Sequence, residues 1–176
     1  VAREKDLALA LASPSLRIEA PIPGASLVGI EVPNPRPTVV TLRSVMETDA
    51  FRSLSSKSKL ALGLGMGTGG EIAATDLARM PHLLTAGSTG SGKSVCINSI
   101  IACIIMHSSP WETRMLLIDP KRVELTPFNG IPHLLTPVVV ETDQVVGLLK
   151  GMIHEMMDRY RRMEEIGVRN IESFNK

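Results

Sequence analysis

The longest periodic pattern of apolar positions lies in the last third of the chain. Thr142 is a residue type that caps helices, and Asp143 would lie in the first turn after it. Apolar side chains then recur at spacings of three and four residues, at Val145, Leu149, Met152, Met156, Tyr160 and Met163. That spacing puts them on one side of a helix. The pattern therefore predicts a long amphipathic helix that begins after Thr142 and ends near Gly167.

A second helix is predicted in the middle of the chain, and its pattern is different. Residues 95–107 are apolar almost all round, which is typical of a helix packed against a sheet. The apolar runs 82–86 and 115–119 lie on either side of it and predict two short buried strands. Strand, loop, helix and strand in this order indicate an α/β domain.

Shorter apolar segments, separated by proline and glycine, occupy the first 78 residues. They predict helices over residues 4–11 and 44–54, strands over 16–19, 27–32 and 39–42, and a hairpin of 60–64 with 71–74. We therefore expect a small mixed α/β domain over residues 1–78. A second domain, residues 79–176, would follow it.

The turn of the predicted hairpin matches a cofactor motif. Residues 65–70 read Gly-Met-Gly-Thr-Gly-Gly, which fits the dinucleotide pattern G-x-G-x-x-G. No adequate helix follows, however, and no acidic residue lies about twenty positions further on to bind a ribose. We interpret the run as a hairpin turn.

Composition narrows the function classes. The chain has 176 residues, enough for a real hydrophobic core, and its net charge of +1 indicates no particular partner. Aromatic residues make up 3%, which argues against a stacking platform for single-stranded nucleic acid. Cys96 and Cys103 would lie about 10 Å apart on one helix, too far for a disulfide, as expected in a reducing cytoplasm. No apolar stretch reaches the length needed to span a bilayer, and the chain starts at Val1, so we expect a soluble fragment of a longer protein.

The strongest chemical signal is a glycine-rich run between the first predicted strand and its helix. The run Gly87-Ser88-Thr89-Gly90-Ser91-Gly92-Lys93-Ser94 fits the phosphate-binding pattern G-x-x-x-x-G-K-[ST] at every fixed position. Glycines let successive backbone N–H groups point at phosphates, and the helix beginning near Val95 directs its positive end at the same anion. Lys93 would stabilise the γ-phosphate of ATP, and Ser94 would bind Mg²⁺.

Asp119 ends the second predicted strand, and two interpretations stay open. Four apolar residues followed by Asp describe a Walker B strand, which would hold Mg²⁺ through water. No carboxylate directly follows Asp119 to activate a water molecule. We favour an extra strand inserted before Walker B, as in RecA-like ATPases. Asp119 would still lie at the carboxyl end of the sheet, near the nucleotide.

Several blocks of sequence together resemble the FtsK/SpoIIIE family of DNA translocases. The resemblance begins with 20–24 and 29–34, continues through 80–94 and 118–121 with Glu124-Leu125, and extends to 131–139 and 167–171. It covers nearly the whole chain. These blocks are far more specific than a P-loop alone.

The resemblance implies an ATP-driven motor that moves double-stranded DNA in chromosome segregation, cell division or sporulation. Members of the family form a hexameric ring around the duplex and are tethered to the cytoplasmic face of the bacterial membrane by another segment. The family's α domain would be residues 1–78. Residues 79–176 would be the first part of a RecA-like ATPase domain, with a P-loop NTPase fold and a partial sheet.

The family's Walker B carboxylates, arginine finger and DNA-facing loops have no counterpart in this sequence. We therefore expect the chain alone to bind nucleotide weakly, with negligible turnover. Two alternatives stay open: a protein-translocating ATPase like those of type VII secretion, and a nucleotide-binding module without turnover. A GTPase is disfavoured because the guanine-reading motif Asn-Lys-x-Asp does not occur.

Overall fold

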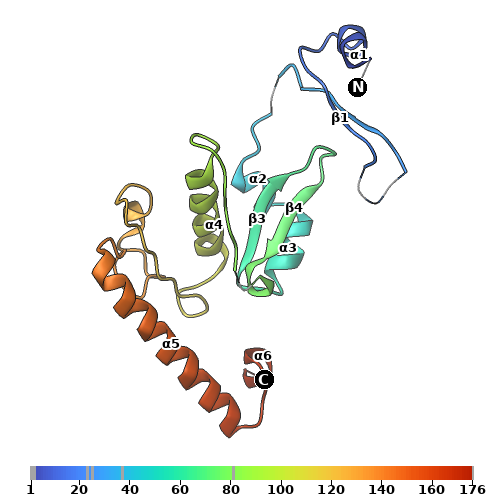
Figure 1. Cartoon of the computed structure of the whole chain (residues 1–176). Helices are drawn as coiled ribbons and strands as arrows, with labels where there is room; N and C mark the ends of the chain where they lie inside the picture. The colour runs from blue at the N-terminus through green and yellow to red at the C-terminus, as the bar shows by residue number, and fades with distance from the viewer. Residues whose placement is uncertain (1–2, 23, 25, 37, 81, 176) are drawn as a thin grey trace. The chain divides into compact units, whose positions relative to one another are not determined.

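The computed structural model describes residues 3–22, 24, 26–36, 38–80 and 82–175. The chain divides into two compact units, Val1–Val39 and Val40–Lys176. Figure 1 shows that each unit combines helices with short strands. The predicted α/β class is therefore confirmed. The predicted domain boundary near residue 78 differs from the division into compact units and stays a prediction.

The first unit holds one helix and one hairpin. Helix α1 spans Glu4–Ala10, and strands β1 (Arg17–Glu19) and β2 (Gly29–Glu31) pair in antiparallel register with Ile18 opposite Ile30. These elements were all predicted from the apolar pattern.

The second unit opens with two short helices, α2 (Leu42–Met46) and α3 (Asp49–Ser55). A single helix over 44–54 was predicted and is wrong, because Thr48 has extended backbone and its hydroxyl accepts the Phe51 N–H at the start of α3. The strand predicted over 39–42 is also wrong. The Thr41 hydroxyl accepts the Ser44 N–H there and begins a helix instead.

A twisted hairpin forms the centre of this unit. Strands β3 (Ala61–Met66) and β4 (Ile72–Asp76) pair antiparallel, and the single-turn helix η1 (Leu77–Arg79) follows β4. The Gly67 N–H donates to the Glu71 carbonyl at 2.8 Å, and Gly70 has φ +85°. Residues 67–70 of the glycine run thus form a hairpin turn, as predicted, and Gly65 and Met66 end β3.

Helix α4 (Lys93–His107) packs against β3, and together with α3 they enclose the core. Phe51, Ala61 and Cys103 are almost fully buried there. The Cys103 sulfur accepts the Gly63 N–H at 3.4 Å and lies 3.6 Å from the Ala61 carbonyl oxygen. Both cysteines are free thiols, as predicted.

The strand predicted over residues 82–86 is not formed. These residues have no regular secondary structure, and Leu84 is 89% exposed. The segment 115–119 pairs elsewhere: isolated parallel bridges join Met115 to Leu134 and Ile118 to Val139. Residues 82–86 form no bridge to another segment, and a buried strand is stable only when it is paired along its edges.

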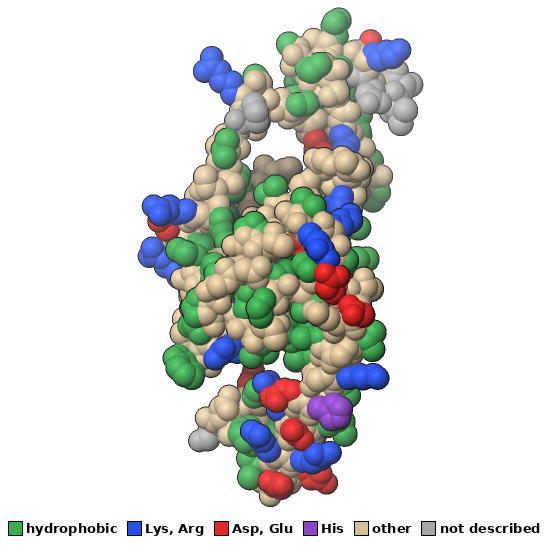
Figure 2. All heavy atoms as spheres, turned by 90° about the vertical axis from the view of Figure 1, so that its left-hand side faces the viewer, with side chains coloured by type: hydrophobic (Ala, Val, Ile, Leu, Met, Phe, Trp, Pro, Cys, Tyr) green, Lys and Arg blue, Asp and Glu red, His purple; other side chains and the backbone are tan. Residues whose placement is uncertain are grey.

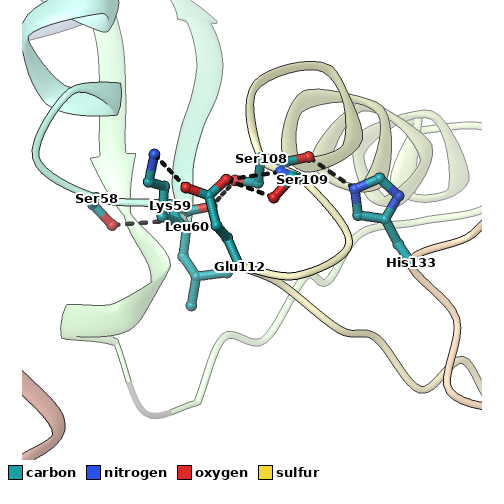
Figure 3. Close-up of polar contacts among 7 residues, drawn as sticks. All are labelled: Ser58, Lys59, Leu60, Ser108, Ser109, Glu112 and His133. Atoms are coloured by element: carbon teal, nitrogen blue, oxygen red, sulfur yellow. Dashed lines mark hydrogen bonds and ion pairs between the residues drawn. The ribbon is translucent and has the colours of Figure 1, made fainter. Parts of the chain in front are cut away.

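The far end of α4 is tied to two other segments (Figure 3). The Ser108 hydroxyl donates to the Lys59 carbonyl, and His133 Nε2 donates to the Ser108 carbonyl at 2.8 Å. Glu112 accepts the Ser109 N–H at 2.9 Å and pairs with the Lys59 ammonium at 2.8 Å. These bonds join the start of β3, the end of α4 and the segment carrying His133. The single-turn helix η2 (Thr126–Phe128) precedes that segment.

Helix α5 (Thr142–Glu165) and the short helix α6 (Ile171–Phe174) end the chain. The N-cap of α5 is Glu141, so the prediction of Thr142 as N-cap is wrong by one residue. The helix ends as predicted, with Gly167 at φ +71° and the Val168 N–H bonded to the Met163 carbonyl. On α5, Arg159 pairs with Glu155 and Arg161 with Asp158. Figure 2 shows acidic and basic side chains close together toward the bottom of the face that it draws.

Among the described residues, we find no helix with the length and hydropathy that crossing a lipid bilayer requires.

Candidate nucleotide-binding site

The glycine-rich loop lies immediately before α4, and its backbone requires glycine at two positions. Gly90 has φ +80° in the turn that the Ser91 N–H closes onto the Ser88 carbonyl, and Gly92 has φ +93° at the N-cap of α4. L-residues with a side chain rarely adopt these angles. A Cβ at Gly87 would lie 2.3 Å from the Ser91 hydroxyl oxygen, so the Ser91 side chain would have to move to accommodate one.

The start of α4 supplies the backbone donors. The first backbone bond of the helix runs from the Cys96 N–H to the Gly92 carbonyl at 2.8 Å. The N–H groups of Lys93, Ser94 and Val95 precede it, and the first N–H groups of a helix have no acceptor within that helix. These donors, at the positive end of a 15-residue helix, suit a phosphate group.

The Lys93 side chain folds back over the loop. Its ammonium donates to the carbonyls of Gly87 and Ser88, each at 2.8 Å. The cation therefore lies on the same short loop whose amides suit an anion. An arriving phosphate would compete with two neutral carbonyls for the ammonium, and a charged acceptor makes the stronger bond.

The Ser94 hydroxyl has a partner that the sequence analysis did not assign to the site. It donates to a carboxylate oxygen of Glu124 at 2.5 Å. Glu124 lies thirty residues further along the chain, and both side chains are half-buried. The available signal was an acidic residue five positions after the strand-ending Asp119, within a block that carried the family resemblance.

Asp119 lies one step further from the loop and holds the segment that carries Glu124. Its carboxylate accepts the N–H groups of Glu124 and Leu125, each at 2.9 Å, and only 6% of the residue is exposed. The Leu125 N–H does most to lower the pKa of Asp119 below its ordinary value, against the opposing effect of burial. The Asp119 N–H donates to the Val139 carbonyl, which anchors the residue to the paired segment.

The structure thus brings together the residues predicted for the site. The loop 87–92, the helix start 93–95 and, through Glu124, Asp119 form one connected group. The donor set fits a magnesium-bound nucleoside triphosphate: backbone amides and an ammonium for phosphates, and a hydroxyl beside a carboxylate for a hard cation.

The loop and the α/β fold define a P-loop protein, and comparison with known proteins gives the particular family. Residues 41–176 match the FtsK/SpoIIIE family, and residues 1–34 match the FtsK alpha domain. The chain belongs to the FtsK/SpoIIIE family.

Two relatives illustrate the match. The chain is 56% identical over 171 residues to the DNA translocase FtsK of Caldanaerobacter subterraneus subsp. tengcongensis, which covers 97% of this chain and 24% of that protein. It is 51% identical over 172 residues to the DNA translocase SpoIIIE of Bacillus subtilis, with 97% and 21% covered. The chain therefore spans about a quarter of the length of these relatives.

A solved structure resembles the fold over almost the whole chain. It is the monomer form of the pCW3 conjugation coupling protein TcpA with ATPγS. The TM-score is 0.57 at 21% sequence identity, with 99% of this chain and 46% of that chain covered. At this identity the likeness supports the fold alone.

Proposed function

We propose that this chain is the ATP-binding part of an ATP-driven double-stranded DNA translocase. The observation that carries the proposal is the P-loop at the start of α4 in a chain whose family relatives are named DNA translocases over 97% of its length. We extend to this chain the DNA translocase activity for which those relatives are named.

In the proposed site, backbone groups from Gly87 to Val95 hold the phosphates. Lys93 leaves the two loop carbonyls that it now contacts and stabilises negative charge on the γ-phosphoryl group. Ser94 would hold Mg²⁺, which would supply positive charge to offset that of the phosphates. Asp119 does not contact the P-loop directly; its carboxylate holds the backbone of Glu124 and Leu125 in place.

Hydrolysis and movement of DNA would need groups beyond these residues. We propose that the protein works as a homo-oligomer, a hexameric ring around the duplex, tethered to the cytoplasmic face of the cell membrane by a segment outside this sequence. A division into a small domain over 1–78 and a RecA-like domain from residue 79 belongs to the same proposal.

The test is steady-state ATP hydrolysis by the whole protein, with and without linear double-stranded DNA. We expect strong stimulation by DNA, and a loss of turnover of roughly a hundredfold or more in Lys93→Ala, because the ammonium stabilises the transferring phosphoryl group. Lys150→Ala, a charge removal on exposed α5, is the matched control and should retain the stimulation.

Turnover that ignores DNA would contradict the translocase and favour a protein-translocating ATPase. Tight ATP binding with no turnover under either condition would favour a nucleotide-binding module instead.

A further inference from the structure

A carboxylate lies where the P-loop presents its metal-binding hydroxyl. Glu124 accepts the Ser94 O–H at 2.5 Å, although the two residues come from different segments of the chain. An ionised carboxylate can only accept hydrogen bonds, so the hydroxyl proton points at Glu124. Glu124 therefore places a negative charge directly beside the loop that suits phosphate.

The position of Glu124 is held by its own backbone. Its N–H and that of Leu125 both donate to the buried Asp119 carboxylate at 2.9 Å. Asp119 is in turn fixed through its N–H to Val139. Charge-assisted bonds to backbone amides are strong and directional, so the segment 119–125 presents Glu124 to Ser94 as part of the fold.

The charge of Glu124 has opposite effects on the two forms of the nucleotide. ATP without a metal brings several negative charges to the loop, and a nearby carboxylate repels them. A divalent cation prefers carboxylate and hydroxyl oxygens, so the same group favours the metal-bound form. A residue in this place raises the selectivity of the site for magnesium-bound over free nucleotide.

We propose that Glu124 determines the magnesium dependence of nucleotide binding, and that Asp119 is the positioning residue that holds it against Ser94. The inference rests on the proposed function only in taking ATP as the nucleotide of the P-loop. It assigns a role to Glu124, which neither the P-loop pattern nor the predicted site included.

The experiment measures the dissociation constant of mant-ATP for the whole protein by fluorescence, in EDTA and in excess Mg²⁺. The quantity compared is the dissociation constant in EDTA divided by the dissociation constant in Mg²⁺. Glu124→Gln keeps the shape and removes the charge, and we expect the ratio to fall by about tenfold, with tighter binding in EDTA. Glu112→Gln is the matched control, because it removes a carboxylate just beyond the far end of α4, roughly 20 Å from Ser94, and should leave the ratio unchanged.

The positioning role of Asp119 needs a separate readout. Asp119→Ala should lower the ratio in the wild-type background and change it little in the Glu124→Gln background, because both substitutions act through one carboxylate. Asp119→Asn retains one acceptor oxygen, so its ratio should lie between those of wild type and Asp119→Ala. This variant replaces Asp119→Ala in the experiment if the alanine variant does not fold. Independent effects of the two substitutions would overturn the positioning role.

The outcomes separate this inference from the proposed function. A Glu124→Gln variant with the wild-type ratio would overturn the inference and leave the translocase untouched. A lowered ratio in a protein whose turnover ignores DNA would support the inference and contradict the translocase. Absence of mant-ATP binding by the wild type would overturn both.

Discussion

Helices α4 and α5 are both rich in apolar side chains, yet α4 buries several of them and α5 leaves its own exposed. Helix α4 places Ile101, Cys103 and Ile104 in the interior against the β3–β4 hairpin, and its N-terminus presents the P-loop. Helix α5 has no buried residue along its 24 positions, and Leu149 and Tyr160 on its apolar side are more than half exposed. The apolar pattern predicts each helix, whereas burial depends on which elements are placed against it. The phosphate-binding loop therefore precedes α4, the helix that is packed against other elements, and not α5.

The largest expected effect comes from opening the core under α4. Phe51 is 2% exposed and its ring lies edge-on to that of His107, with the centroids 5.6 Å apart. Phe51→Ala should lower the free energy of unfolding by about 3–5 kcal/mol, through lost burial and a residual cavity. Met156→Ala on α5, where the side chain is exposed, should cost less than about 1 kcal/mol. Urea unfolding of the two variants, followed by circular dichroism, gives the comparison. Equal losses would mean that α5 is buried as fully as α4.

A smaller effect is expected from filling space beside the same core. A Cβ at Gly63 would lie 2.9 Å from Cγ1 of Val45, which is itself 2% exposed. Gly63→Ala should therefore destabilise the chain by about 1–3 kcal/mol, since a packed neighbour has to move. Thermal unfolding measures this, and an unchanged midpoint would show that Val45 yields without cost.

The same substitution on α5 should act in the opposite direction. At Gly151, in the helix interior, a Cβ would have no atom within 4 Å. Gly151→Ala should stabilise the helix by about 0.5–1 kcal/mol, because alanine loses less backbone entropy than glycine. The measurement is the same thermal scan. A destabilised variant would indicate that another surface packs closely on this side of α5, and the contrast between the two helices would then fail.

The sequence predicted the features that depend on local chemistry. The P-loop requires glycine at positive φ, so Gly90 and Gly92 identified it, and the apolar run after it identified α4. The β3–β4 hairpin followed from a glycine turn between apolar segments. Each of these patterns lies within a short stretch of sequence and needs no distant partner to be identified.

Features that depend on distant or competing partners were missed. The helix predicted over 44–54 is broken because the Thr48 side chain caps a new helix, a choice that apolar periodicity does not record. The strand predicted at 82–86 needed a paired neighbour, and these residues form no bridge to another segment. Glu124 meets Ser94 across thirty residues, and only the fold brings them together.

The smallest expected effect concerns the ion pair beyond the end of α4. The Lys59 ammonium and, after it, the Ser109 N–H hold the pKa of Glu112 down to about 2, against an ordinary value of 4.5. Because the folded-state pKa is the lower one, the pair stabilises the fold above about pH 4.5 and loses that contribution as the pH falls toward 2. Glu112→Gln should therefore lower the unfolding midpoint slightly at pH 7, and the difference from wild type should shrink between pH 4.5 and 2. The effect stays small because both side chains are partly exposed to solvent. Glu164→Gln, which also removes a carboxylate but on exposed α5, is the matched control. A gap between Glu112→Gln and wild type that persists at pH 2 would mean that Glu112 acts through its hydrogen bonds to Ser109 rather than through its charge.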